Sequence, residues 1–228
     1  MKLIIFDCDG TIVDSQHAIV AAMEAGFAEH GLVAPNREDV LGVVGLSLVE
    51  AVERLLPVEL RLDAAARVAE SYKAAFADLR QKSVHHEPLF PGAMETLNSL
   101  RARDDILLGI ATGKSRRGVD ALFEREGLHE HFVTIQTADD HPSKPHPSMI
   151  ERAMRECGVE PDATVMIGDT TYDIEMAHAA GVSALGVTWG YHPREALEIV
   201  APHLLVEDYS KVPGALWQLL KMDGEAAA

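Results

Sequence analysis

The stretch from Leu3 to Thr11 constrains the fold most, because a short apolar run passes directly into a polar turn. The four consecutive apolar residues that begin at Leu3 are typical of a strand buried on both faces of a sheet. Asp7 and Asp9 follow that strand, and Gly10 permits a tight turn that brings Asp9 back over the strand end. Two carboxylates at one crevice could divide nucleophilic attack on phosphorus from proton transfer. An ordinary polar junction between strand and loop has the same pattern, so the rest of the chain must distinguish the two.

A long helical stretch comes next. Apolar residues recur at helical spacing, with no strand pattern between them, over residues 15–30, 37–44, 47–56 and 64–81. We therefore expect residues 15–87 to form an inserted all-helical domain, a bundle of about four helices. The adjacent His85 and His86 have no third metal ligand at a recognisable spacing, which favours a solvated loop.

From Pro88 onward the chain alternates helices with strands. Helices are expected at 92–103, 116–126, 145–157, 171–180 and 213–222, and strands at 106–111, 132–136, 164–167, 184–187 and 204–206. This alternation predicts an α/β fold with a doubly wound parallel sheet of the Rossmann-like type, built from residues 1–14 and 88–228. The two connections, Asp14–Ser15 and Pro88–Pro91, suggest hinges on which the helical insert opens and closes.

Composition excludes several classes of partner. The formal net charge of −16 disfavours nucleic acid and anionic membrane surfaces. No apolar run approaches the roughly 18 residues of a membrane helix. The two cysteines, Cys8 and Cys157, are too few for a disulfide framework. We expect a cytoplasmic protein, monomeric or homodimeric.

Polar groups follow two further apolar strands and one proline-rich loop. Thr112 and Gly113 precede a helix, where a hydroxyl and free N–H groups can meet an anion, although a helix cap has the same pattern. Lys144, framed by prolines, offers a fixed cation. Asp169 and Asp173 lie at a strand-to-helix junction, four residues apart. Because carboxylates at so many strand ends repel one another without a cation, we expect a Mg²⁺ site.

Taken in order, these segments resemble the four motifs of the haloacid dehalogenase superfamily of phosphatases. They are Asp7-x-Asp9-Gly-Thr, Thr112-Gly, Lys144-Pro and Gly-Asp169-x-x-x-Asp173. The resemblance spans essentially the whole chain, because the helical insert looks like the mobile cap of that superfamily.

The resemblance implies a role for each matching residue. Asp7 would be the nucleophile that forms an aspartyl-phosphate, and Asp9 the acid that protonates the leaving alcohol and then activates water. Thr112, the backbone of Gly113 and Lys144 would hold the phosphoryl oxygens. Asp7, the main-chain carbonyl of Asp9 and Asp169 would bind Mg²⁺, while Asp173 would act through water or by positioning Lys144.

The same resemblance narrows the reaction. The family's dehalogenases lack an aspartate where Asp9 stands, so this chain looks like a phosphatase. The helical insert together with the segment from Gly186 to Tyr191 resembles phosphoglycolate phosphatases and their near relatives, which makes a small phosphorylated acid such as 2-phosphoglycolate the leading substrate. Trp189 and Tyr191 could instead only pack the sheet edge, and Arg116 and Arg117 could meet a substrate carboxylate or be solvated.

Three alternatives stay open. A phosphosugar mutase of the β-phosphoglucomutase kind shares both aspartates, but the insert is rich in alanine, leucine and valine over residues 41–56, with few polar groups for a sugar. An inorganic pyrophosphatase of the same subfamily is the second. A non-catalytic phosphate-sensing module is the third, and it is disfavoured because all candidate catalytic side chains are present.

Overall fold

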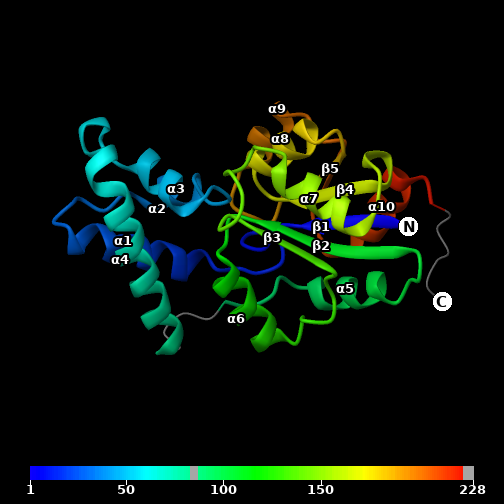
Figure 1. The fold of residues 1–228 in the computed structure, drawn as a ribbon, viewed down its shortest axis with the longest axis horizontal. Coiled ribbons are helices and arrows are strands. Elements are labelled where there is room, and N and C mark those ends of the chain that lie inside the picture. Colours follow the sequence, from blue (N-terminus) through cyan, green and yellow to red (C-terminus); the bar gives the residue numbers. More distant parts are fainter. Residues whose placement is uncertain (83–86, 223–228) are drawn as a thin grey trace.

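The protein is built around a six-stranded parallel sheet (Figure 1). The computed structural model describes residues 1–82 and 87–222, so His85 and His86 lie outside the described residues. The strand order is β3-β2-β1-β4-β5-β6, with β1 (Lys2–Phe6), β2 (Ile106–Thr112), β3 (Thr134–Thr137), β4 (Thr164–Gly168), β5 (Ser183–Val187) and β6 (Leu204–Val206). This arrangement confirms the predicted doubly wound fold. The connection changes direction between β1 and β4, which is where open α/β sheets bind ligands outside their strand ends.

Helices cover both faces of this sheet, because β1 alternates its side chains between them. Ile4 and Phe6 pack against one layer, and Leu3 and Ile5 against the other. The first layer consists of α5 (Ala93–Arg101), α6 (Arg116–Glu126) and α10 (Val212–Leu220), and the second of α7 (Ser148–Cys157), α8 (Thr171–Ala179) and α9 (Arg194–Ile199). All four side chains have no solvent exposure, which explains why the first strand is an uninterrupted apolar run.

Some element boundaries differ from those predicted. Helix α7 begins at Ser148 rather than at residue 145, because His146 precedes Pro147 and a residue before proline is disfavoured in the helical backbone conformation. Helix α9 and three 3-10 turns, at Val58–Leu60, Pro161–Ala163 and Tyr209–Lys211, were not predicted. Six-residue and three-residue elements are too short to show a clear apolar period.

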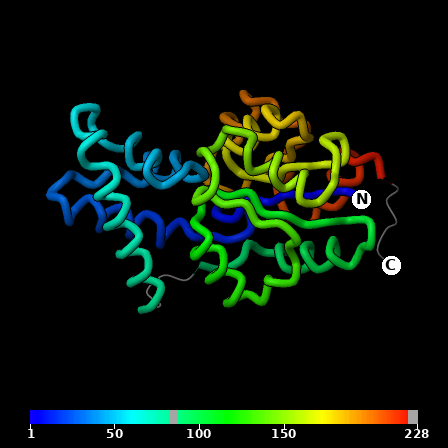
Figure 2. Tube along the Cα trace, in the orientation of Figure 1, coloured from blue at the N-terminus to red at the C-terminus, as the bar shows by residue number. Residues whose placement is uncertain are grey.

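The helices that follow β1 pack mainly on one another, and residues 16–81 are called the helical segment below. They are α1 (Gln16–Glu29), α2 (Arg37–Leu41), α3 (Leu48–Leu55) and α4 (Arg61–Gln81). Met23 and Phe27 of α1 meet Val52 of α3 and Val68 of α4 in a core separate from those of the sheet. Figure 2 shows the helical segment at one end of the molecule, with the N-terminus of β1 at the other. The carboxyl ends of the strands therefore face the helical segment, and no helix within the described ranges is long and apolar enough to cross a membrane.

The chain enters and leaves the helical segment through two adjacent backbone segments, Ile12–Asp14 and Pro88–Phe90, which are called the neck below. The Asp14 N–H donates to the Pro88 carbonyl at 2.8 Å, and the Phe90 N–H donates to the Ile12 carbonyl at 3.0 Å. Val13 and Leu89 form an antiparallel bridge between these bonds. The division into domains at 14/15 and 87/88 stays a prediction, but both of its boundaries lie at the neck.

A buried carboxylate that pairs with two partly exposed arginines stabilises the neck. The Glu87 carboxylate lies 3.1 Å from Arg80 of α4 and 3.1 Å from Arg125 of α6. The Arg125 guanidinium also donates to the Glu87 carbonyl at 2.7 Å. One carboxylate therefore joins the last turns of the helical segment to a helix that packs on the sheet.

Candidate active site

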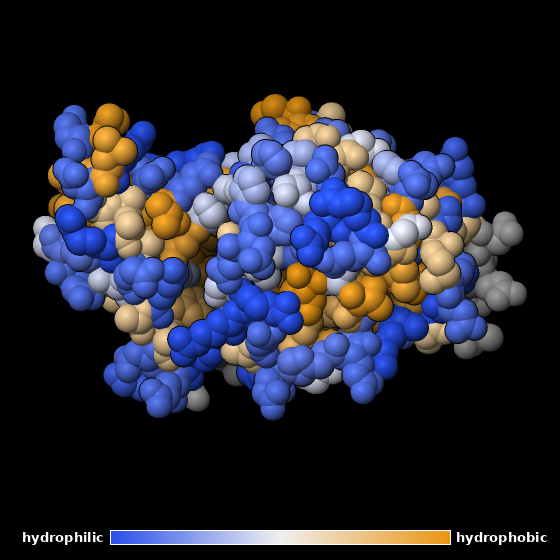
Figure 3. All heavy atoms as spheres, viewed as in Figure 1, coloured by the Kyte–Doolittle hydropathy of each residue, from blue (hydrophilic) through white to orange (hydrophobic). Residues whose placement is uncertain are grey.

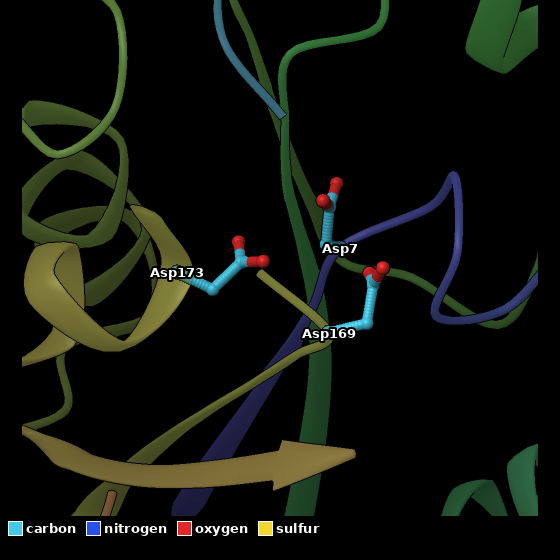
Figure 4. A group of neighbouring side chains, drawn as sticks. All are labelled: Asp7, Asp169 and Asp173. Carbon is cyan, nitrogen blue, oxygen red and sulfur yellow. The ribbon is translucent and has the colours of Figure 1, made fainter. Parts of the chain in front are cut away.

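Three carboxylates converge where β1 and β4 end (Figure 4). Asp7 follows β1 directly, Asp169 follows β4, and Asp173 lies in the first turn of α8. One oxygen from each lies within 4.8 Å of the others, and all three side chains are buried. The pairing of β1 with β4 creates this cluster, because the Asp7 N–H donates to the Ile167 carbonyl at 3.0 Å and so fixes the two strand ends in register.

Lys144 lies inside this cluster. Its Nζ is 2.9 Å from Asp7 Oδ2 and 2.7 Å from Asp173 Oδ1. The side chain of Lys144 is fully buried, so its charge is balanced by these two carboxylates rather than by water. The structure thus brings the lysine of the proline-rich loop to the acids of two strand ends, as the sequence predicts.

Asp173 is held from both sides. Its Oδ2 accepts the Thr170 N–H at 3.1 Å and the Thr170 hydroxyl at 2.7 Å, and Thr170 in turn caps the helix by accepting from the Asp173 N–H. This capping box fixes the carboxylate at the start of α8. Asp173 is therefore placed to orient Lys144.

Asp169 is held by groups from distant parts of the chain. It accepts the Thr11 hydroxyl at 2.8 Å and the Tyr191 N–H at 2.8 Å. Gly10 has a φ of 84°, and a Cβ there would lie 2.1 Å from Asp169 Oδ2. Gly10 is therefore needed for two reasons, its left-handed backbone and the close approach of a carboxylate.

The pKa shifts of the clustered side chains indicate an excess of negative charge. Burial raises the pKa of Asp7 to about 6; Lys144 opposes this shift and Asp173 adds to it. Burial, and then Asp173 and Asp7, raise the pKa of Asp169 well above its ordinary value. Burial alone would lower the pKa of Lys144, but Asp173 and Asp7 outweigh it and raise that pKa. One ammonium does not compensate three buried carboxylates.

The cluster fits a divalent cation such as Mg²⁺. All of its donors are carboxylate oxygens, which hard cations prefer. Asp7 Oδ2 is buried and accepts no hydrogen bond from the described residues beyond its ion pair with Lys144. A cation held by Asp7 and Asp169 would offset the negative charge that, after burial, raises the pKa of both carboxyl groups.

Asp9 lies beside the cluster and makes a separate set of contacts. Its Oδ1 is 2.6 Å from Lys114 Nζ, and it also accepts the Ser15 hydroxyl. Ser15 directly precedes α1, but its side chain makes no cap hydrogen bond, and its hydroxyl donates to Asp9 instead. The Ser15 N–H meanwhile donates to the Tyr191 hydroxyl at 2.9 Å.

Thr112 and Gly113 stand at the end of β2, next to the helical segment. Thr112 is buried, and its Oγ1 accepts the Lys114 N–H at 3.2 Å. A Cβ at Gly113 would lie 2.6 Å from the carbonyl oxygens of both Gly45 and Leu46. The absence of a side chain at Gly113 thus allows the loop between α2 and α3 to reach the edge of the sheet at which the strands end.

Two hydrogen bonds fasten that loop to the sheet core. The Ser47 N–H donates to Ser143 Oγ at 2.8 Å, and the Tyr172 hydroxyl donates to the Gly42 carbonyl at 2.9 Å. Arg54 of α3 also stacks on the Tyr172 ring, 5.3 Å from its centroid. Residues 45–47 therefore lie against the end of β2 and the loop that carries Ser143.

A cavity of about 590 Å³ opens between the helical segment and the strand ends. Figure 3 shows the surface hollowed there, with hydrophobic side chains in the hollow. Asp7, Asp9 and Thr112 line its sheet side, and Met23 and Phe76 belong to its helical side. A ligand with phosphate at the strand ends would therefore extend toward α1 and α4.

Sequence reasoning missed some residues of this site and underrated others. Lys114 directly follows the Thr-Gly pair, and that adjacency was the available signal. Trp189 and Tyr191 do more than pack the sheet edge, because the Trp189 indole N–H donates to the Thr11 carbonyl at 3.1 Å and Tyr191 reaches Asp169 and Ser15. Arg116 pairs with Asp120 at 2.9 Å, whereas Arg117 lines the cavity.

Comparison with known proteins gives related sequences over the whole chain. The chain is 35% identical over 224 residues to the probable phosphatase IndB of Dickeya dadantii, covering 96% of this chain and 95% of that protein. It is 32% identical to a phosphoglycolate phosphatase of Synechococcus elongatus (97% and 100% covered) and 31% identical to the pyrophosphatase PpaX of Oceanobacillus iheyensis (93% and 95% covered).

Solved structures share the fold at similar coverage. A haloacid dehalogenase-like hydrolase of Streptococcus pneumoniae superposes with a TM-score of 0.79 at 25% identity, covering 94% of this chain and 98% of that one. A β-phosphoglucomutase of Clostridium difficile superposes with a TM-score of 0.82 at 20% identity, covering 97% of each chain. The model of the haloacid dehalogenase-like hydrolases matches residues 4–187, which confirms the resemblance drawn from the four motifs. The chain belongs to the haloacid dehalogenase-like hydrolase family.

Proposed function

We propose that the protein is a Mg²⁺-dependent phosphatase that hydrolyses a small phosphate monoester through an aspartyl-phosphate on Asp7. The observation that carries the proposal is the pair of carboxylates on one wall of the cavity, Asp7 inside the acidic cluster and Asp9 outside it. Asp7 is held by Lys144, whereas Asp9 is reached by Lys114 and Ser15. Two carboxylates in such different surroundings suit two different roles.

In the first half of the reaction, Asp7 attacks phosphorus and the bond to the leaving oxygen breaks. Asp9 gives its proton to that oxygen, so the alcohol leaves neutral. In the second half, Asp9 takes a proton from water, which attacks the aspartyl-phosphate, releases phosphate and restores Asp7. Thr112, the Gly113 backbone and Lys144 hold the phosphoryl oxygens, since Lys144 contacts Asp7 and the other two residues stand at the end of β2, the strand that pairs with β1.

Mg²⁺ would be held by Asp7, the main-chain carbonyl of Asp9 and Asp169, where it would offset the negative charge of the phosphoryl group and the acids. Asp173 keeps Lys144 in place through the contact of 2.7 Å. We further propose that residues 15–87 act as a cap on a core formed by residues 1–14 and 88–228, with the loop at Gly45 and Leu46 shielding the site from water.

For the substrate we propose 2-phosphoglycolate, the compound in the name of one relative at 32% identity. Pyrophosphate is a second candidate, because a relative at 31% identity is named a pyrophosphatase. The mutase alternative is less favoured, because the solved structure named a β-phosphoglucomutase is only 20% identical. The cavity wall of Val40, Val43, Val44 and Leu46 also offers few partners for sugar hydroxyls.

Phosphate release from 2-phosphoglycolate, pyrophosphate, β-glucose 1-phosphate and other sugar phosphates tests the proposal, with Mg²⁺ and then with chelator. We expect metal-dependent turnover of 2-phosphoglycolate above the others. Asp7→Asn should abolish turnover while the circular dichroism spectrum stays that of the wild type. Full activity in Asp7→Asn, or activity that survives chelation, would refute the assignment.

A further inference from the structure

Among the described residues, Lys114 contacts Asp9 with a charge to which the proposed mechanism assigns no role. It lies between the end of β2 and the start of α6, and its side chain is 8% exposed. Burying an ammonium is costly unless it is paired, and Asp9 supplies the pair at 2.6 Å. Since a proton carrier in hydrolysis has no need of a permanent cation beside it, the position of Lys114 calls for a second explanation.

The local structure aims the Lys114 ammonium into the cavity. A Cβ at Gly118 would lie 2.8 Å from Lys114 Cγ, so Gly118 leaves the space in which the aliphatic stem packs. The ammonium lies 5.4 Å from the centre of the Phe76 ring of α4, over its face. Lys114 is thereby held between the sheet core and the helical segment.

The ammonium has hydrogen-bonding capacity beyond Asp9. A lysine carries three N–H donors, and the one acceptor that Lys114 meets among the described residues is Asp9. The ring of Phe76 offers a face rather than a lone pair. Lys114 lines the cavity, so a ligand there can accept the remaining donors.

Other cations at the cavity are placed differently. Lys73 pairs with Glu70 at 2.7 Å, and Arg80 pairs with Glu87 at 3.1 Å. Lys144 does not line the cavity and is buried between Asp7 and Asp173. Arg117 is exposed at the rim. Within residues 1–82 and 87–222, Lys114 is thus the cavity cation that contacts Asp9.

We propose that Lys114 determines specificity by binding an anionic group of the substrate that lies close to the oxygen leaving phosphorus. This inference rests on the proposed function, in which Asp9 protonates that oxygen from hydrogen-bond distance, about 2.6–3.2 Å. The leaving oxygen and the Lys114 ammonium are then neighbours of the same carboxylate. A carboxylate one methylene group from that oxygen, or the second phosphate of pyrophosphate, reaches Lys114, whereas a neutral alcohol leaves it unused.

Two esters isolate this contact. 2-Phosphoglycolate and 2-hydroxyethyl phosphate differ only in a carboxylate against a hydroxymethyl group, and pyrophosphate adds the other anionic leaving group. The quantity measured is kcat/KM for each compound, and the ratio of the two esters cancels any general effect of Lys114 on Asp9. We expect the wild type to favour 2-phosphoglycolate by about tenfold or more, as a charge-assisted hydrogen bond predicts.

In Lys114→Met this ratio should fall toward one, chiefly through a higher KM for 2-phosphoglycolate, while Lys114→Arg should keep most of it. Lys73→Met is the matched control, because Lys73 lines the same cavity but is paired with Glu70 on α4; it should leave the ratio unchanged. If Lys114→Met selectively loses kcat/KM for 2-phosphoglycolate or for pyrophosphate, that loss identifies the anionic group that Lys114 binds.

Three results would overturn the inference. One is a wild-type ratio near one for the two esters together with no preference for pyrophosphate over 2-hydroxyethyl phosphate, which needs no variant. A second is an equal loss on both esters in Lys114→Met, which would leave Lys114 as a partner of Asp9 only. The third is a collapse of the ratio in Arg117→Met instead. Failure of the wild type to hydrolyse any phosphate ester would refute the proposed function itself, and so is distinguishable from these.

Discussion

Replacing Gly113 with alanine tests how the helical segment meets the sheet. The added Cβ would lie 2.6 Å from the carbonyl oxygens of Gly45 and Leu46, closer than real Cβ contacts. Both neighbours are backbone, so no flexible side chain can yield, and the loop must move away by several tenths of an ångström. We expect Gly113→Ala to displace the helical segment from its observed position.

The size of the effect follows from the two hydrogen bonds that fasten this loop, Ser47 to Ser143 at 2.8 Å and Tyr172 to Gly42 at 2.9 Å. Each contributes about 1 kcal/mol, so losing both costs about 2 kcal/mol, or about 30-fold in the population of the fastened state. Exchange of the Ser47 amide hydrogen measures this population directly. We expect about 30-fold faster exchange there, together with a fall in kcat/KM.

Gly214→Ala is the matched control, because a Cβ at that position in α10 meets nothing within 4 Å. It should leave exchange at Ser47 unchanged, and it should not lower stability, since alanine favours helix over glycine. Equal Ser47 exchange rates in Gly113→Ala and in the wild type would refute the close approach of the loop to Gly113.

The acidic cluster yields three further predictions. Lys144→Met should lower the free energy of unfolding by about 3–5 kcal/mol in urea titrations, because it leaves buried carboxylates unpaired; a loss under about 1 kcal/mol would contradict the ion-pair geometry. Asp169→Asn should weaken Mg²⁺ binding by more than about tenfold in calorimetry without lowering the melting temperature in chelator, and unchanged affinity would exclude Asp169 as a ligand. Burial raises the pKa of Asp7 from 3.8 to about 6, so the folded chain keeps a proton that the unfolded chain has lost. The contribution of this proton to the free energy of unfolding is complete below the unfolded pKa and is lost as pH rises through about 6. The metal-free wild type should therefore lose stability relative to Asp7→Asn between about pH 4 and pH 6. Parallel curves of unfolding free energy against pH for the two proteins would contradict this prediction.

The strand ends were predictable because their signal is local. A strand buried on both faces needs a continuous apolar run, and the polar residue after it marks the edge where ligands bind. Asp7, Thr112 and Asp169 each stand at such a position, and parallel pairing then brings them together whatever the length of the chain between them.

Contacts made by hydroxyl and ammonium groups were not predictable in this way. Ser15 has the sequence context of a helix cap, yet its hydroxyl bonds to Asp9. Tyr191 reaches Ser15 across 176 residues, and Lys114 bends over Gly118 toward Asp9. The partner of a flexible or hydroxyl-bearing side chain depends on which segments meet in space, and hydrophobic period and residue spacing carry no information about that.

Because of the neck between Ile12–Asp14 and Pro88–Phe90, the folding of the sheet core depends little on which segment is inserted there. Because the Asp14 N–H and the Pro88 carbonyl meet at 2.8 Å, the entry and exit of the helical segment are already as close as the two ends of a hairpin. Closing a loop costs free energy only as the logarithm of its length, so a short turn or an unrelated domain could replace the helices with little change to the folding of the sheet. Replacing the whole helical segment could then change which leaving groups are accepted. The residues at the strand ends, which bind the phosphoryl group in the proposed mechanism, would remain unchanged.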